Sequence, residues 1–466
     1  MIAIEAERSH LSSEEHLSAT PDPSEELGVV PGGQRGPGLP WSIVGSLLNG
    51  ARSVVGDPRT AGLLRAGLRV AQFVAGCRQR NSLAETDDTV LRVPTTPGLA
   101  AQAYVDEVLI AAFRHPDLFP KEQDFEPASL ELASARSLFE KRGWLDDPAS
   151  YHTPLPAPDD ARSTYHHTHS IGYEKLSFTS GWEPYREEPG RQRWMAHQAN
   201  QTVHAFVARA PGHTQKKWLV CAHGFGMGSK PLMDLRAFRA SRLHAMGVNV
   251  VIPVMPLHGE RSSGRVKGED LMTISMVDSM HGVAQAVSDV RRLIKWLREV
   301  EGAEEVGVAG LSLGGLVAAL VASLEDDLSC VVAGIPVVDL PDLFRRHSPP
   351  DIAATARRYG VLGEVADQVH SVVSPLAMEC NVPSERRYIF AGLGDRMSSF
   401  GQARRLWLHW NRPSLCAYTG GHVGFYWSGA VKRFVDEAVS TSFQIAADPS
   451  RPGSEVSMSS SDRRQG

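Results

Sequence analysis

Short apolar runs alternate with longer stretches of helical spacing along the second half of this chain. Between 277 and 300, for example, Val283, Val287, Val290 and Ile294 recur at the three- and four-residue intervals of an amphipathic helix. The short runs are apolar at successive positions, which is typical of strands that are buried on both faces. Such strands separated by helices predict an α/β fold with a parallel sheet covered by helices on both faces. The predicted parallel strands are 218–222, 248–254, 306–312, 330–335, 388–391 and 414–418.

Two further segments, 173–178 and 202–207, favour antiparallel strands that precede the parallel ones. Together these elements make 165–445 the predicted main domain. The stretch 341–378 lies between two predicted strands and is too long for a simple crossover. We expect it to be a helical insertion that forms a cap or lid over the catalytic edge of the sheet.

The pattern at 41–150 is helical but interrupted, and we expect a helical extension that packs against the main domain or covers it. Arginines such as Arg65 and Arg69 allow a helix on a membrane surface as one interpretation. We favour the other, an amphipathic helix packed on the protein with solvated arginines. The segments 1–40 and 446–466 bury too little apolar surface to offset their ordering entropy, so we expect disordered tails.

The candidate chemistry centres on Gly310-Leu311-Ser312-Leu313-Gly314, which joins a predicted strand to a predicted helix. The two glycines lack the Cβ atoms that would collide where strand and helix close up around a sharp turn. Ser312 is left at the apex, beside the unpaired N–H groups of the helix start. This context predicts a nucleophilic serine, whereas a Gly/Ser-rich loop is the alternative interpretation.

A serine nucleophile needs an adjacent base, and the base needs a carboxylate that orients it. In a parallel sheet these groups meet only on loops that follow the carboxyl ends of strands. Asp395 and His422 each follow a predicted strand, and the chain order Ser, Asp, His is the one expected for such a turn. We therefore predict a triad of Ser312, Asp395 and His422, with Asp339 as the reserve acid.

The oxyanion of an acyl-transfer reaction needs two N–H donors. We assign them to the backbone of Leu313, directly after the nucleophile, and of Phe225, in the loop after the strand 218–222. Gly224 and Gly226 allow the backbone of this loop to approach closely.

Four residues of two loops are assigned to the substrate pocket: His223, Gly224, Gly226 and His258. We expect His223 to orient the loop of the oxyanion donor by hydrogen bonding. His258 belongs to the loop after the next strand, and we expect it to shape the pocket. A polar loop with satisfied structural hydrogen bonds is an equally good account of His258.

These motifs together resemble the α/β-hydrolase superfamily, of the esterase/lipase type. The resemblance rests on His-Gly at 223–224, Gly-Leu-Ser-Leu-Gly around Ser312, Gly-Leu-Gly-Asp ending at Asp395, and Gly-Gly-His-Val-Gly-Phe around His422. It spans about residues 170–445 and does not reach the helical extension. It implies an eight-stranded, mostly parallel sheet and a serine hydrolase that acts through an acyl-enzyme.

Composition narrows the classes of partner. The chain has 466 residues, of which 42% are apolar and 22% charged, and its net charge of −5 gives no reason to expect nucleic acid. Its five cysteines lack paired or metal-type spacing, and the histidines of 165–169 point to opposite faces of an extended segment. We expect neither a metal site nor a cofactor.

The start of the sequence lacks a basic segment followed by an apolar one, so we expect no secretory signal. No stretch has the length of continuous apolar residues that a membrane-spanning helix needs. We therefore expect a cytoplasmic protein.

The first functional hypothesis is a hydrolase that cleaves a small-molecule carboxylic ester, lipid-like esters included. A peptidase, amidase or thioesterase on the same triad is the second, because the fold does not separate these reactions. The third is a non-catalytic scaffold of the same fold that binds a ligand or partner. It usually requires the loss of a triad residue, and all three are present.

Overall fold

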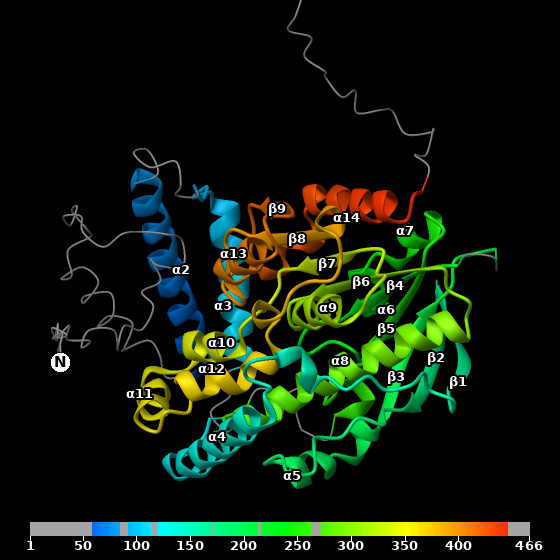
Figure 1. Ribbon diagram of the computed structural model, residues 1–466. Coiled ribbons are helices and arrows are strands. Elements are labelled where there is room, and N and C mark those ends of the chain that lie inside the picture. Colours follow the sequence, from blue (N-terminus) through cyan, green and yellow to red (C-terminus); the bar gives the residue numbers. More distant parts are fainter. Residues whose placement is uncertain are drawn as a thin grey trace, which may run out of the picture.

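The computed structural model of the chain describes residues 58–83, 92–113, 119–168, 171–212, 216–262, 271 and 273–445. The predicted tails, 1–40 and 446–466, and the first part of the predicted extension, 41–57, lie outside the described residues. Figure 1 shows a twisted sheet through the centre, with helices on both sides of it and the helices of the extension at one end.

The central sheet has nine strands in the order β1-β2-β3-β5-β4-β6-β7-β8-β9. Neighbours from β5 to β9 are parallel, with Val220 of β4 opposite both Val251 and Val308, whereas β1, β2 and β3 pair in antiparallel fashion. The strands are β1 (Arg162–Thr168), β2 (Ile171–Thr179), β3 (Thr202–Ala208), β4 (Lys217–Ala222), β5 (Asn249–Pro253), β6 (Glu305–Leu311), β7 (Val331–Gly334), β8 (Arg387–Gly392) and β9 (Ser414–Tyr418).

The predicted α/β fold with a mostly parallel sheet is confirmed, but the expected number of eight strands is wrong. The additional strand is β1, which pairs along its whole length with β2. Its residues are polar and are exposed from Arg162 to His167. The apolar pattern does not indicate such a strand, because its pairing depends on the neighbour rather than on burial of its own side chains.

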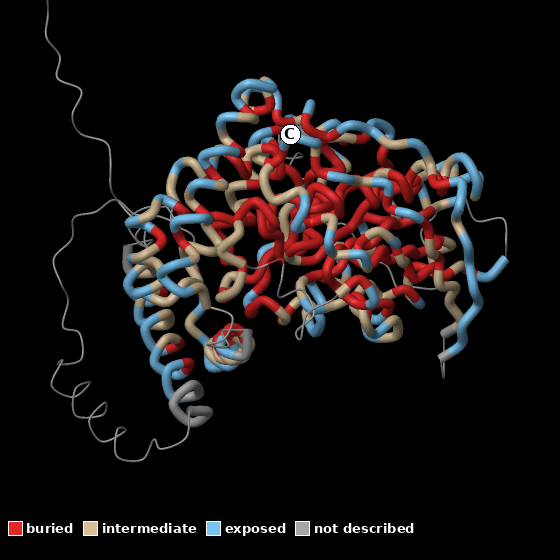
Figure 2. The backbone as a smooth tube through the Cα atoms, turned by 90° about the horizontal axis from the view of Figure 1, so that it is seen from below, coloured by how far each residue is buried: buried red, intermediate tan, exposed pale blue. Residues whose placement is uncertain are grey.

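Side chains of the strands alternate between two apolar layers, one on each face of the sheet. On β4, Trp218 and Val220 point into the layer of α8 and α9, and Leu219 and Cys221 point into the layer of α6, α7 and α14. Figure 2 shows that the buried backbone is concentrated in this sandwich. The helices are α6 (Pro231–Ala237), α7 (Ala240–Ala245), α8 (Met276–Glu299), α9 (Leu313–Leu324), α13 (Ser399–His409) and α14 (Gly429–Ser442).

The segment predicted as a cap contains α10 (Leu340–His347), α11 (Pro350–Arg358) and α12 (Glu364–His370). α12 packs against α8 and against α4 (Glu122–Arg142) of the extension. α10 reaches the loop of the predicted catalytic acid, since His347 Nε2 lies 2.6 Å from the carbonyl oxygen of Met397. The insertion is helical, and its opening and closing as a lid stays a prediction.

The other described helices of the extension, α2 (Pro58–Leu83) and α3 (Pro97–Phe113), pack side by side at one end of the molecule (Figure 1). Arg69 of α2 forms a 3.2 Å ion pair with Glu107 of α3, so this arginine joins the two helices to each other. Among the described helices, none combines the length and the apolar character needed to cross a bilayer. Contact of the extension with a membrane surface stays a prediction.

A buried ion pair holds the loop after β5 against α8. Arg261 Nη1 lies 2.8 Å from Asp289 Oδ2, and the two side chains are 0% and 2% exposed. The guanidinium also donates to the carbonyl oxygens of Val254 and Asn200, and Asp289 accepts a hydrogen bond from Ser180. Buried charges are tolerated when they are paired and hydrogen-bonded in this way. The pair therefore fixes the loop between Val254 and Arg261.

Asp289→Ala should lower the free energy of unfolding by about 3–5 kcal/mol, because it leaves the Arg261 charge buried without its partner. Chemical denaturation followed by circular dichroism measures the change. Glu304→Ala is the matched control: it removes an exposed ion pair with Lys216 and should change the free energy by less than about 1 kcal/mol. Equal effects of the two substitutions would contradict the role given to the buried pair.

Candidate active site

The predicted nucleophile lies on a strained turn between β6 and α9. Ser312 has φ 57° and ψ −114°, a backbone conformation that residues with a Cβ rarely adopt. A Cβ added to Gly310 would lie 1.9 Å from the carbonyl oxygen of Gly314, and one added to Gly314 would lie 1.9 Å from that of Ala222. Glycine is therefore required at both positions for β6 and α9 to close against β4.

The loop after β4 lies directly against this turn. A Cβ added to Gly224 would lie 3.7 Å from the Cβ of Ser312 and 3.3 Å from the carbonyl oxygen of Leu311. The predicted donor Phe225 comes next in the chain, and Gly226 follows with φ 77°, a value that favours glycine. The other predicted donor, Leu313, is the first residue of α9, where N–H groups have no intrahelical acceptor. The predicted donor Leu313 thus directly follows Ser312, and the predicted donor Phe225 follows Gly224, which lies against the turn.

His223 hydrogen-bonds the loops after β4 and β5 to each other. Its Nδ1 lies 2.8 Å from the carbonyl oxygen of Gly224, and its Nε2 accepts the Met255 N–H at 3.0 Å. We therefore assign the ring proton to Nδ1. Burial lowers the pKa of His223 to about 3, with smaller contributions from His258 and from the guanidinium of Arg261, so the imidazole is neutral. These contacts agree with an orienting role for His223.

His258 is fully buried and packs against two residues of the loop after β4. Its ring centroid lies 5.3 Å from that of His223 and 5.6 Å from that of Phe225. Its Nδ1 lies 2.8 Å from the carbonyl oxygen of Pro256, and its Nε2 has no hydrogen-bond partner among the described residues. Burial lowers the pKa of His258 to about 4. His258 therefore packs against the loop of the predicted donor Phe225, and a pocket-lining role stays a prediction.

The predicted base and acid are in direct contact. His422 Nδ1 lies 2.7 Å from Asp395 Oδ2, and the two side chains are 7% and 1% exposed. Asp395 Oδ1 accepts the N–H groups of Met397 and Ser398 at 2.8 and 3.0 Å, which fixes the plane of the carboxylate. With the Nδ1 proton donated to Asp395, the His422 Nε2 carries the lone pair that a base needs.

The structure does not join Ser312 to His422 in the same way. Within the described part of the chain, the Ser312 hydroxyl forms no hydrogen bond with His422. Such bonds are often long or misaligned without substrate and tighten when it binds. The parallel strands β6, β8 and β9 nevertheless end at one edge of the sheet, and Ser312, Asp395 and His422 all follow those ends.

His422 and Asp395 stabilise each other's charge. Burial alone would raise the pKa of Asp395, but the charge and hydrogen bond of His422 hold it below its usual value. Burial alone would lower the pKa of His422, but Asp395 and also Asp106 raise it above 6.5. The arrangement favours an imidazolium beside a carboxylate, which is the charge pair formed when a histidine takes up a proton from a nucleophile.

Two residues outside the predicted triad complete this cluster. Ser398 Oγ lies 3.0 Å from Asp395 Oδ2 and 3.3 Å from His422 Nδ1. Asp106 of α3 accepts the N–H of His422 at 2.7 Å. No sequence signal marks Ser398 beyond its position three residues after Asp395. Asp106 could have been considered, because the pair Asp106-Glu107 lies within a helix that is otherwise mostly apolar.

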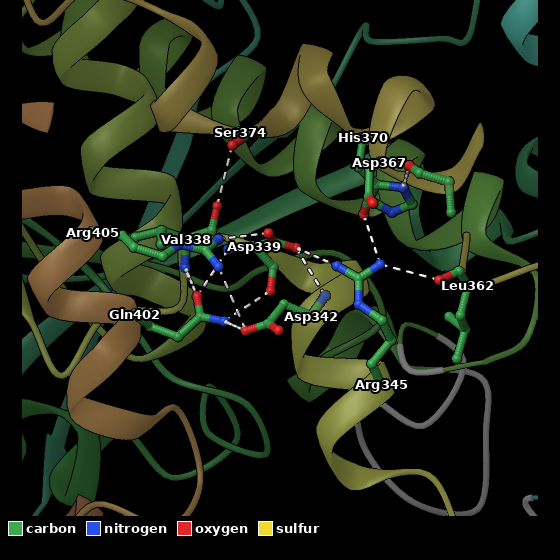
Figure 3. A network of polar contacts seen from close by, with 11 residues as sticks. Val338, Asp339, Asp342, Arg345, Leu362, Asp367, His370, Ser374, Gln402 and Arg405 are labelled. Atoms are coloured by element: carbon green, nitrogen blue, oxygen red, sulfur yellow. Dashed lines mark hydrogen bonds and ion pairs between the residues drawn. The ribbon is translucent and has the colours of Figure 1, made fainter. Parts of the chain in front are cut away.

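Asp339, the reserve acid, has other partners. Its Oδ1 accepts the N–H of Asp342 at the start of α10, and its Oδ2 lies 2.5 Å from Arg405 of α13. Figure 3 shows this network, which also includes Gln402 and Arg345 and links the cap segment to α13. Asp339 is therefore a structural carboxylate, and Asp395 is the acid that contacts His422.

A cavity of about 360 Å³ lies between the sheet and the helices α6, α7 and α14. Its walls include Leu311, which precedes Ser312, and Phe425, which follows His422 in the same turn. The side chains of the predicted triad do not line it. The cavity therefore adjoins the segments that carry Ser312 and His422 without being lined by either side chain.

The sequence and the structure are similar to those of known proteins. The family model described as "Alpha/beta hydrolase domain containing 18" matches residues 191–338. "Uncharacterized protein MT2702" of Mycobacterium tuberculosis (strain CDC 1551 / Oshkosh) is 38% identical over 381 residues, which cover 81% of this chain and 90% of the relative.

Among solved structures, the chain is similar to two esterases at low identity. The acetyl xylan esterase of Paenibacillus sp. R4 has a TM-score of 0.45 at 16% identity, and the match covers 65% of this chain and 93% of the esterase. Acetyl xylan esterase 1 of Thermoanaerobacterium sp. JW/SL YS485 has a TM-score of 0.42 at 14% identity, and the match covers 65% of this chain and 99% of the esterase.

Gly314→Ala should disrupt the turn that carries Ser312, because the new methyl group would lie 1.9 Å from the carbonyl oxygen of Ala222. We expect the free energy of unfolding to fall by at least about 3 kcal/mol, measured by denaturant titration. Gly67→Ala on the exposed face of α2 is the control; its methyl group meets no atom of the described residues within 4 Å, and the variant should gain about 0.5–1 kcal/mol. Wild-type stability of Gly314→Ala would show that the turn is packed less closely than described.

Proposed function

The chain belongs to the α/β-hydrolase superfamily, in one family with the Mycobacterium tuberculosis relative, and on this premise we propose that it is a serine hydrolase of carboxylic esters. One observation carries the proposal: the 2.7 Å contact of His422 with Asp395 at the sheet edge where the strained turn of Ser312 also lies. A buried imidazole that is paired with a carboxylate next to an apical serine is suited to activating that serine.

In the proposed reaction, Ser312 Oγ bonds to the acyl carbon of the ester while His422 Nε2 takes the hydroxyl proton. The tetrahedral intermediate then breaks its bond to the alcohol oxygen, which receives that proton from His422 and leaves. Water attacks the resulting acyl-enzyme in the same manner, giving its proton to His422. Ser312 Oγ leaves with this proton, and the carboxylic acid is released. Throughout, Asp395 keeps the imidazole oriented and stabilises its positive charge.

The developing oxyanion is assigned to the N–H groups of Phe225 and Leu313. Support comes from the position of Gly224, where an added Cβ would lie 3.7 Å from the Cβ of Ser312, and from the position of Leu313 at the start of α9. The N-terminus of a helix favours negative charge, and donors fixed in advance lose no energy to reorganisation. The buried His223 and His258 behind this loop hold it in place without carrying charge themselves.

The ester class rests on the resemblance of the motifs to esterase- and lipase-type proteins. Amides and thioesters react through the same groups, so the substrate class is tested with matched esters, thioesters and aminoacyl amides of short and long acyl chains. We expect the highest kcat/KM for an ester. A higher value for an amide or a thioester would assign the protein to that reaction instead.

A fluorophosphonate probe tests the nucleophile. We expect peptide mass spectrometry to find the label on Ser312, and Ser312→Ala to lose the label without a change in unfolding. Ser323→Ala is the matched control, since Ser323 is a buried serine of α9 that donates to the carbonyl oxygen of Ala319, within its own helix. Label on another serine would refute the assignment of Ser312, and no label at all would favour the non-catalytic scaffold.

The acidic limb of kcat/KM should have its midpoint above 6.5, because the base must be neutral and Asp395 raises the pKa of His422. Asp395→Asn removes the carboxylate charge and should move this midpoint to lower pH. It should also reduce kcat by roughly 10⁴-fold, as expected when the imidazole loses its orienting acid. Steady-state rates over the acidic and neutral range measure both. A midpoint that stays in place in Asp395→Asn would contradict the pairing.

A further inference from the structure

We propose that α3 of the N-terminal extension is part of the active site, and that Asp106 is a positioning residue that holds the loops of the base and the acid in one arrangement. The inference rests on the proposed function, since positioning these loops matters to the reaction only if His422 and Asp395 take part in it. Its support is a pair of hydrogen bonds that connect Asp106 to Arg396 and His422, which lie 290 and 316 positions further along the chain.

One carboxylate oxygen of Asp106 accepts backbone N–H groups from both loops. Oδ2 lies 2.7 Å from the N of His422 and 3.0 Å from the N of Arg396. Because Arg396 directly follows Asp395, the same oxygen fixes the backbone that carries the acid and the backbone that carries the base. Asp106 is 0% exposed, so water does not compete for these N–H groups.

Gln102 repeats this contact one turn earlier on the same face of α3. Its Oε1 accepts the N–H of Gly421 at 3.1 Å. Residues four positions apart project from one side of a helix, so Gln102 and Asp106 present a row of acceptors to the loop of His422. α3 therefore replaces the water or loop contacts that would otherwise satisfy these buried N–H groups.

The glycines of the two catalytic loops leave space for α3. A Cβ added to any of four of them would come within 3.0 Å of an α3 side-chain atom: Gly421 at 2.8 Å from Asp106, Gly420 at 2.6 Å and Gly424 at 2.1 Å from Gln102, and Gly394 at 2.4 Å from Leu99. All four glycines lie outside the positive-φ region, so their backbone conformation alone does not require glycine. At Gly421 the added Cβ would also lie 2.9 Å from the backbone oxygen of Gln102, which cannot turn aside as the end of a side chain can. The loops are therefore shaped to receive the extension.

The neighbouring side chains fasten α3 through Glu107 rather than through Asp106. Glu107 accepts from Arg396 Nε at 3.1 Å and pairs with Arg69 of α2. The Arg396 guanidinium also lies 4.8 Å from the ring centroid of Phe73. Among the described residues, Asp106 Oδ1 has no hydrogen-bond partner. A buried carboxylate with an unsatisfied oxygen costs stability, so the contribution of Asp106 lies in what it positions.

The charge of Asp106 also acts on the base. Burial, followed by the like charge of Asp395, raises the pKa of Asp106 to about 7, and Asp106 in turn adds to the rise in the pKa of His422. Removal of this charge therefore lowers the pKa of His422. The charged and titratable groups that face Asp106 are Asp395 and Arg396 from the loop after β8, Tyr418 and His422 from β9 and its loop, and Glu107 beside it on α3.

Two substitutions in the full-length chain separate the charge of Asp106 from its hydrogen bonds. Asp106→Asn keeps an oxygen for both N–H groups and places its amide where Oδ1 has no partner; we expect a folded enzyme whose acidic limb of kcat/KM moves to lower pH. Asp106→Ala also loses the hydrogen bonds, and kcat should fall by about 10–100-fold with KM changed less than about twofold. The control Asp160→Asn, at a carboxylate that accepts the N–H of Thr179 in β2, should leave both quantities unchanged.

Hydrogen exchange provides a measurement that does not depend on catalysis. In Asp106→Ala, peptides that contain Arg396 and His422 should exchange faster, while the rest of the chain and Asp106→Asn keep wild-type rates. If wild-type protein takes up no fluorophosphonate label, the proposed function fails, and this exchange pattern alone decides whether Asp106 positions the loops. Wild-type kcat, pH profile and exchange in both variants would overturn the proposal. Faster exchange over the whole chain with an unmoved pH profile would also overturn it, because it indicates a purely structural role.

Discussion

Close contact between backbone segments leaves no room for a Cβ at Gly310 and Gly314, on either side of the turn between β6 and α9, and this packing determines where Ser312 lies. The turn holds Ser312 in a conformation that costs about 1–3 kcal/mol. The helix that follows is buried along almost its whole length, and each fully buried Leu or Val such as Leu316, Val317 and Leu320 contributes about 1.5–3 kcal/mol. Burial of α9 therefore outweighs the strain severalfold. The serine is held at the apex because the helix behind it has no other place to pack.

Each loop around this turn is held by a polar side chain that reaches it from another element. His223 connects the loops after β4 and β5, and Arg261 with Asp289 fixes the second of these to α8. Asp106 reaches the loops after β8 and β9 from the extension. These groups are almost fully buried, so their hydrogen bonds form in surroundings of low dielectric constant and are stronger than in water. Oriented groups in such surroundings can stabilise a developing charge without rearranging first.

Features encoded within one short segment could be predicted from the sequence, and features that depend on a distant partner could not. The turn at Ser312 and the loops of Asp395 and His422 carry their glycines and their reactive residue within a few positions, so their place at the strand ends followed from the pattern. Asp339 and Asp395 both follow a predicted strand, and the choice of Asp395 over Asp339 agrees with the contact of Asp339 with Arg405 and of Asp395 with His422. Likewise, the glycine-rich loops indicate that side chains must be absent, but the reason is the approach of α3, which local sequence does not contain. Strand β1 was missed for the same cause, since a polar edge strand is defined by its neighbour.

The contact between Asp106 and His422 has a consequence for the order in which the protein can be made. The 316 residues between them take about 15–60 s to synthesise at roughly 5–20 residues per second. During that time α3 has emerged from the ribosome, but the loops that cover its inner face do not yet exist. Long-range contacts of this kind are also the slow ones to form, because the chain must close a large loop before they contribute. For most of its synthesis the nascent chain therefore carries α3 with α2 beside it but with its inner face uncovered, and that face is a site where a chaperone or a premature association with another chain would act first.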